Sequence, residues 1–175
     1  MPYINVEIKA RTHRSAAIHE FLMEQGAEFV GTDIQKDTYF HVPEGRLKLR
    51  EGAIENNLIF YMRADVAGPR SSAFDLAPVP DPDGMLQVLS KALGVKVTVV
   101  KKRSIYYLAN VKFHLDEIEG LGSFVEIEAG NKRVDLPLET LQEQCDHYIR
   151  AFEIAKEDFI QVSYSDMLLS RLNAE

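Results

Sequence analysis

The 175-residue sequence has a single cysteine, no tryptophan and no long apolar run. One cysteine, Cys145, excludes an intrachain disulfide and a cysteine-based zinc cluster. No apolar stretch approaches the ~18 residues of a membrane-spanning helix, so we expect no membrane partner. The N-terminal region carries Glu7, Lys9 and Arg11 where a signal peptide would be apolar, which favours a cytoplasmic protein.

Positive charge is also scarce. The chain holds 20 Lys/Arg against 27 Asp/Glu, a formal charge of −7. Nucleic-acid-binding proteins usually show a basic footprint, so we expect no nucleic-acid partner. The charge is uneven, because residues 1–115 hold 15 basic and 13 acidic side chains, whereas residues 116–175 hold 5 and 14. What the protein binds therefore depends on where the basic side chains of the first part point.

The length suits one domain over residues 1–175. Apolar and polar residues alternate along several segments, with the period of two that is typical of strands. We expect strands at 3–11, 33–42, 46–50, 57–65, 72–77, 95–108, 111–118 and 123–129. We expect helices at 14–25, 84–93 and 138–152, with shorter ones near 156–161 and 165–172.

Most of these strands carry one charged face and one apolar face. In the first strand Val6 and Ile8 share the apolar face, while Glu7 and Lys9 share the other. On a two-layer sheet such charged faces would meet solvent. In a barrel they would line the lumen, and the amphipathic helices would cover the apolar outer wall. The pattern favours an α+β fold: a closed or nearly closed eight-stranded antiparallel barrel with helices packed outside.

A lumen lined by lysine and arginine favours a polyanionic ligand, because confined cations repel one another. The basic side chains expected inside are Lys9, Arg11, Arg46, Lys48, Arg50, Arg63, Lys101 and Arg103. The carboxylates expected beside them, Glu7, Glu126 and Glu128, do not bind phosphate directly. Oxygen ligands of this kind favour Mg²⁺ or Mn²⁺, and such an ion would bridge carboxylates to a phosphate.

Five stretches in chain order resemble the marks of the CYTH, or triphosphate tunnel, enzymes. They are Asn-Val-Glu-Ile-Lys (5–9), Leu-Lys-Leu-Arg (47–50), Arg63, Lys-Lys-Arg-Ser-Ile-Tyr-Tyr (101–107) and the segment 113–128. Within the family, the Lys-x-Arg-Ser-Ile-Tyr stretch, the Gly-Leu-Gly-x-Phe turn and the segment 163–168 are most similar to the class IV adenylate cyclases. That branch converts ATP to cyclic AMP and pyrophosphate, and sister branches hydrolyse thiamine triphosphate or inorganic triphosphate.

The resemblance implies a role for each group of side chains. The triphosphate would be bound by Lys9, Lys48, Arg50, Arg63, Lys101 and Arg103. The catalytic set would be Lys9, Arg50, Arg63, Arg103 and Asp116. Glu7, Glu126 and Glu128 would hold Mg²⁺ or Mn²⁺. Asn5 stands where the family usually has its first glutamate, which puts one metal site in question.

Three functions follow as alternatives. The first is a class IV adenylate cyclase, and the second is a triphosphatase that uses nearly the same residues. The third is a non-catalytic module that binds a nucleotide or polyphosphate, which the neutral Asn5 favours. A homodimer formed through an outer face of the barrel is an alternative to a monomer.

Four residues outside these sets have interpretations of their own. His114 shares a face with the expected Asp116 and serves either structural hydrogen bonding or proton transfer. Asp37, which shares a face with Tyr39, serves substrate contact or packing, or lies only on a solvated face. We expect Cys145 to be a buried structural thiol and Lys102 to face outward.

Overall fold

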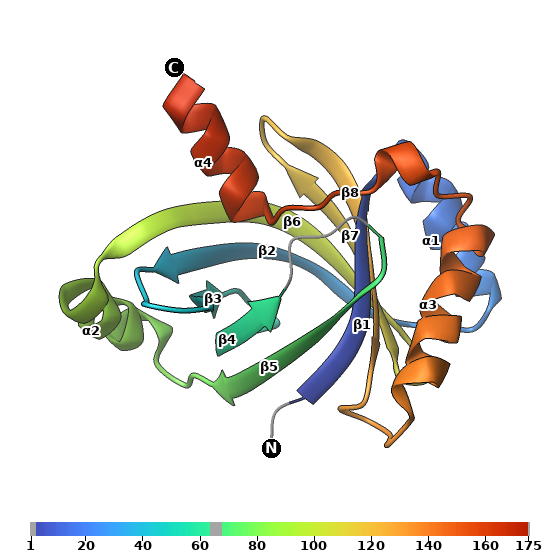
Figure 1. The fold of residues 1–175 in the computed structure, drawn as a ribbon, viewed down its shortest axis with the longest axis horizontal. Helices are drawn as coiled ribbons and strands as arrows, with labels where there is room; N and C mark the ends of the chain where they lie inside the picture. Colours follow the sequence, from blue (N-terminus) through green and yellow to red (C-terminus); the bar gives the residue numbers. More distant parts are fainter. Residues whose placement is uncertain (1–2, 64–67, 175) are drawn as a thin grey trace.

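The computed structural model describes residues 3–63 and 68–174 (Figure 1). Its antiparallel strands close into a barrel in the order β1-β5-β4-β3-β2-β6-β7-β8. The strands are β1 (Tyr3–Arg11), β2 (Glu28–Phe40), β3 (Arg46–Glu51), β4 (Asn57–Arg63), β5 (Arg70–Pro78), β6 (Val95–Leu108), β7 (Val111–Ile118) and β8 (Gly122–Gly130). The predicted eight-stranded barrel is confirmed.

Helices pack against the outside of the barrel. They are α1 (Ser15–Glu24), α2 (Pro82–Leu93), α3 (Leu138–Ala151) and α4 (Tyr164–Ala174), with a 3₁₀ turn η1 (Lys156–Asp158). Figure 1 shows α1 and α3 together beside β1 and β8, and α2 at the far side near β2 and β3. Within the described ranges, none of the helices is long and apolar enough to cross a membrane.

The alternation in the sequence sorts side chains between the two surfaces of the barrel wall, as expected. On β1, Val6, Ile8 and Ala10 are each at most 2% exposed, and they lie in the hydrophobic cluster beneath α1 and α3. Cys145 of α3 is buried in the same cluster, as predicted. The alternate residues of β1, including Lys9, face the interior of the barrel. The closed barrel thus gives the apolar residues an outer surface beneath the helices and the charged residues an inner surface, as the strand patterns require.

Strand β2 and helix α2 are among the elements that begin earlier than the sequence predicted, and both do so for local reasons. Strand β2 starts at Glu28 and not at 33, because Gly31 adopts a φ of +142° at a bulge that keeps the strand paired with β6. Helix α2 starts at Pro82 and not at 84. Proline suits the first helical turn, and the Asp81 side chain accepts a hydrogen bond from the Gly84 amide as the cap.

The chain between η1 and α4 crosses one end of the barrel (Figure 1). At the start of α4, the Tyr164 ring is 3% exposed and packs edge-on against Phe124. It belongs to a hydrophobic cluster with Val97 and Val99 of β6. The C-terminal segment therefore closes the barrel at this end and completes the wall of the cavity inside.

Candidate functional site

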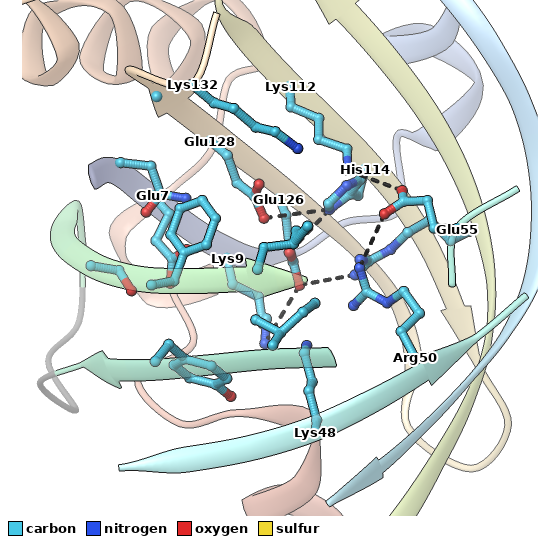
Figure 2. Close-up of a pocket in the computed structure, with 18 of the residues that line it drawn as sticks. Glu7, Lys9, Lys48, Arg50, Glu55, Lys112, His114, Glu126, Glu128 and Lys132 are labelled. Carbon is cyan, nitrogen blue, oxygen red and sulfur yellow. Dashed lines mark hydrogen bonds and ion pairs between the residues drawn. The ribbon is translucent and has the colours of Figure 1, made fainter. Parts of the chain in front are cut away.

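A cavity of about 160 Å³ lies inside the barrel, and strands from all sides contribute to its lining (Figure 2). Its walls differ in chemistry. Basic side chains come from β3 and β6, carboxylates and a histidine come from β7 and β8, and apolar side chains come from β4 and β5. Of the residues proposed from the sequence, the lining includes Glu7, Lys9, Lys48, Arg50, Lys101, Arg103, Glu126 and Glu128.

The cationic wall is built around one carboxylate, Asp37 of β2, which is fully buried. Arg50 donates to both of its oxygens, from Nε at 2.9 Å and from Nη2 at 2.8 Å. Lys101 Nζ lies 2.7 Å from Asp37 Oδ2, and Lys48 Nζ lies 3.1 Å from the same atom. Burial alone would raise the pKa of Asp37, but the attraction of Arg50, Lys101 and Lys48 outweighs it and holds this pKa well below its usual range. Three cations on one carboxylate leave positive charge for an anionic ligand.

Strand register explains why these cations meet. Asp37 of β2 lies opposite Arg50 of β3 and opposite Val99 of β6. Lys48 and Lys101 are each two residues from those partners, so the pleat turns them to the same face. Asp37 therefore contacts its neighbouring side chains, and the packing interpretation describes its observed position.

A second buried pair joins Arg103 and Asp116. The two residues are opposite each other on β6 and β7, and Arg103 donates to both Asp116 oxygens at 2.7 and 2.6 Å. Tyr164 Oη donates to Asp116 Oδ2 at 2.8 Å. Asp116 is 1% exposed and is absent from the described cavity lining. The structure thus places Arg103 at the cavity and the expected catalytic Asp116 behind it, where the carboxylate orients the guanidinium.

The acidic wall consists of two rows of residues across β1, β8 and β7. In the first row, Glu126 of β8 lies between Lys9 of β1 and His114 of β7. In the second row, Glu128 of β8 lies between Glu7 of β1 and Lys112 of β7. Lys9 Nζ lies 3.5 Å from Glu126 Oε1. His114 Nδ1 lies 3.2 Å from Glu126 Oε2 and 3.7 Å from Glu128 Oε1 (Figure 2).

The surroundings shift the pKa of two residues of the acidic wall, Glu128 and His114. Burial, with the charges of Glu126 and Glu7, raises the pKa of Glu128 to about 7 despite the nearby Lys112. Burial, followed in effect by the charge of Arg103, lowers the pKa of His114 to about 3 despite its bond to Glu126. At neutral pH the histidine is therefore neutral and Glu128 is about half protonated, because burial and the charges of Glu126 and Glu7 disfavour its ionised form.

The acidic wall fits a divalent metal ion. One atom each from His114, Glu126 and Glu128 lies within 4.8 Å of the others, close enough for a single ion to contact all three. Glu7, the remaining expected ligand, lines the cavity opposite Glu128 but is outside this group, with its Oε1 3.7 Å from Arg70 Nε. Asn5 also lines the cavity, and its buried Oδ1 has no hydrogen-bond partner in the described part of the chain.

Two of the expected lumen arginines are absent from the described cavity lining, and the side chain of a third is not described. Arg11 is exposed and donates to the Leu121 carbonyl, since it lies at the end of β1 beyond the cavity. Arg46 pairs with Asp166 of α4 at 2.8 Å. The prediction that Arg11 lines the lumen was wrong. Arg46 is on the inner face of the barrel, with its guanidinium 5.9 Å from the ring centroid of the cavity-lining Tyr61, but it is outside the described cavity lining. The backbone of Arg63 is in β4, but its side chain lies outside the described residues.

Several charged residues of the site were missed from the sequence. Lys112 Nζ lies 2.9 Å from Glu55 Oε1, and Glu55 Oε2 lies 3.5 Å from Arg50 Nη1. Lys112 alternates with His114 on β7, so the period of two could have revealed it. Glu55 is in the β3–β4 loop, where no periodicity reports side-chain direction. Arg70 was missed because β5 was predicted to begin two residues later.

The structure confirms the prediction that Lys102 faces outward. Lys102, next to Lys101 on β6, is exposed and lies 3.7 Å from Glu117 on the outer surface. No bulge at this point reverses the alternation. Lys101 and Lys102 are therefore adjacent cations on opposite sides of the same wall.

Comparison with known proteins places this architecture among described folds. The CYTH domain model matches residues 3–164. A Methanocaldococcus jannaschii protein named "Putative adenylate cyclase MJ0240" is 24% identical over 172 residues, which is 94% of this chain and 98% of that protein. The structure of PH1012 from Pyrococcus horikoshii matches with a TM-score of 0.76 at 24% identity, over 93% of this chain and 98% of that one. HpAC1 from Hippeastrum is described as a "Putative adenylyl cyclase" that reveals a dominant triphosphatase activity. Its structure matches with a TM-score of 0.58 at 14% identity, over 99% of this chain and 96% of that one.

Proposed function

Since the chain belongs to the CYTH domain family, we propose that it is a divalent-metal-dependent enzyme that converts ATP to cyclic AMP and pyrophosphate. The observation that carries the proposal is the division of one cavity into a cationic wall, an acidic wall and an apolar wall. These three surfaces match the triphosphate, the metal and the nucleoside of such a substrate. The name of the M. jannaschii relative supports the same activity.

The cationic wall would hold the phosphates. Lys48, Arg50 and Lys101 already surround Asp37, and a triphosphate would draw their remaining hydrogen-bond donors toward its oxygens. Arg103 and Lys9 approach from the other side, next to Glu126. We propose that Arg63 adds a further contact. Fixed positive charges around the β- and γ-phosphates would stabilise the leaving pyrophosphate.

The acidic wall would hold Mg²⁺ or Mn²⁺ through Glu126 and Glu128, with Glu7 beside them. When bound, the ion offsets negative charge on the α-phosphate. The ribose 3′-oxygen would attack the α-phosphorus and form a new P–O bond, while the bond from the α-phosphorus to the oxygen that bridges to the β-phosphate breaks. Pyrophosphate would leave with that oxygen, and the hydroxyl proton would pass to solvent water. Arg103, held in place by Asp116, would stay oriented toward the phosphate during this step.

The apolar wall favours a nucleoside triphosphate over inorganic triphosphate. Ile59 and Tyr61 of β4 lie beside Phe74 and Leu76 of β5 on the cavity lining. Inorganic triphosphate carries charged oxygens throughout and gains nothing from this surface. A purine ring can stack on an aromatic side chain and remove apolar area from water.

Hydrolysis of a triphosphate is the second candidate. The same cations and metal ligands would serve when water replaces the ribose hydroxyl as the nucleophile. The reported triphosphatase activity of the Hippeastrum protein, which shares the fold, favours this alternative. A non-catalytic binding role is the third possibility from the sequence, and turnover of any triphosphate would eliminate it.

Product analysis separates these candidates. The purified protein is incubated with ATP and either Mg²⁺ or Mn²⁺, and separately with tripolyphosphate and with thiamine triphosphate. Cyclic AMP and pyrophosphate in equal amounts are the expected products from ATP. Orthophosphate with ADP, and no cyclic AMP, would replace the cyclase proposal by the hydrolase.

A further inference from the structure

His114 is buried beside the two carboxylates of the acidic wall. The side chain is 1% exposed and its ring lines the cavity. Its Nδ1 faces two carboxylates, while its Nε2 is buried and has no hydrogen-bond partner among the described residues. Nearly all buried polar atoms in folded proteins have a partner. The described part of the fold thus leaves Nε2 unsatisfied, while Nδ1 is the nitrogen placed to share an ion with the two carboxylates.

The spacing of His114 and the two carboxylates fits the ligands of one ion. Two ligand atoms at adjacent corners of an octahedron with bonds of ~2.1 Å lie ~3.0 Å apart, and opposite ones lie ~4.2 Å apart. Nδ1 is 3.2 Å from Glu126 Oε2 and 3.7 Å from Glu128 Oε1, and the three ligand atoms all lie within 4.8 Å. Both Nδ1 distances lie between the values for adjacent and opposite corners, so side-chain adjustments without a change of backbone would bring the set to one ion.

Strand register makes this arrangement rigid. His114 of β7 lies directly opposite Glu126 of β8, and Glu128 follows two residues later on the same face. Each residue is on a paired strand inside the barrel, so none needs a loop movement to reach the others. A site built on strands holds its ligands more exactly than one built on loops.

We infer that His114 is a nitrogen ligand of the metal held by Glu126 and Glu128, and that it makes the site prefer a first-row transition ion such as Mn²⁺ over Mg²⁺. The inference rests on the proposed function, because it concerns the same metal. Mg²⁺ favours sites made of oxygen, whereas an imidazole nitrogen strengthens binding of transition ions more. The position of His114 thus determines metal selectivity as well as affinity.

The test needs only Mn²⁺ and no substrate. The protein is prepared with natural histidine and with [¹⁵N]histidine, loaded with Mn²⁺, and examined by pulsed electron paramagnetic resonance. His114 is the one histidine among the described cavity-lining residues, so a histidine nitrogen bound to Mn²⁺ identifies it. We expect nitrogen coupling whose pattern changes from ¹⁴N to ¹⁵N with the label. An unchanged pattern in protein that binds Mn²⁺ would overturn the inference while leaving the metal site of the proposed function intact.

A pair of variants tests selectivity. His114→Gln should lose the coupling and raise the Kd for Mn²⁺ at least about tenfold, with a smaller change for Mg²⁺. His147→Gln is the matched control, since His147 is exposed on α3 outside the barrel, and it should change neither Kd. Equal losses of Mn²⁺ and Mg²⁺ affinity in His114→Gln would overturn the selectivity claim. Absence of Mn²⁺ binding to the wild-type protein would overturn the metal site itself, and the inference with it.

Discussion

At the scale of single residues, Asp37 organises the cationic side of the tunnel. It is buried with Lys48, Arg50 and Lys101 within 3.1 Å, and its negative charge allows these cations to approach one another. Without it, three like charges would remain in a space of low dielectric constant. One carboxylate therefore both stabilises the fold and keeps the cations ready for an anion.

Replacing Asp37 tests this role. Asp37→Asn should lower the free energy of unfolding by about 3–5 kcal/mol, as expected when one partner of a buried ion pair is removed. Tripolyphosphate should restore more stability to the variant than it adds to the wild type, because it supplies the missing negative charge. Asp75→Asn, at an exposed position of β5, is the control. Urea unfolding that shows equal stability for both variants would show that Asp37 does not hold the cations.

Glu128 gives the metal-free protein a specific pH dependence. Its pKa is raised from the ordinary 4.5 to about 7. A carboxyl group whose pKa is raised on folding contributes stability that is fully present below pH 4.5 and is lost as the pH rises through 7. The glutamine side chain of Glu128→Gln stays neutral, so this loss is absent from the variant. Between pH 4.5 and 7 the free energy of unfolding of the variant should therefore rise relative to that of the wild type by about 1–2 kcal/mol, a figure reduced because the side chain is partly exposed.

The measurement is urea unfolding of both proteins in a chelator at several pH values. Comparing the variant with the wild type cancels the contributions of other titrating groups, including His114, whose lowered pKa acts in the opposite sense. A stability difference that does not change with pH would show that Glu128 titrates normally.

At the scale of elements, α4 matters through its first turn. Tyr164 packs on Phe124, donates to Asp116, and has Lys9 Nζ 3.7 Å above its ring. The helix thereby joins the end of the barrel to the pair of Arg103 and Asp116. The sequence predicted a short terminal helix, but nothing in its pattern showed that its start would complete the cavity wall.

Removing one hydroxyl tests this connection. Tyr164→Phe keeps the ring but leaves Asp116 with one donor fewer, so we expect a loss of about 2 kcal/mol in the free energy of unfolding. Tyr148→Phe on α3 is the control, because no hydrogen bond of its hydroxyl is found in the described structure. Chemical denaturation gives both values, and equal effects of the two changes would argue against the Tyr164–Asp116 bond.

Prediction from sequence succeeded for side chains whose direction follows from strand alternation. It failed for side chains whose position depends on depth in the barrel wall, on a loop or on strand register. The faces of β1, β6 and β8 were read correctly because closure assigns every second residue to the lumen. Alternation cannot tell a residue that lines the cavity from one behind it, which is why Asp116 was grouped with its partner Arg103. Glu55 was missed because loop direction has no period. The metal group was predicted as carboxylates alone, and His114 joined it only once β7 and β8 were in register.

At the scale of the whole molecule, the net charge of −7 conceals a cationic interior. Lys48, Arg50 and Lys101 are inside the barrel, while acidic residues such as Glu139 and Glu143 are exposed on the outer helix α3. A small anion that enters the cavity meets the basic side chains. A long polyanion meets mostly the acidic exterior, which repels it.

This arrangement predicts selective binding by size. Tripolyphosphate should bind, as measured by calorimetry at physiological salt, and should raise the melting temperature. A fluorescently labelled single-stranded oligonucleotide should show no change in polarisation under the same conditions. Comparable binding of both ligands would mean that anions bind mainly to basic side chains on the exterior, which would contradict selection by size.

The adjacent pair Lys101 and Lys102 offers the most direct test that the interior of the barrel is the active site. The two cations are neighbours on β6, but Lys101 lies against Asp37 inside and Lys102 is exposed outside. Turnover of ATP with Mn²⁺ is measured for Lys101→Gln and Lys102→Gln. Lys101→Gln should lower kcat/KM at least about 100-fold, as for loss of a charged group that stabilises the transition state, while Lys102→Gln should match the wild type. Equal rates in the two variants would contradict catalysis inside the tunnel.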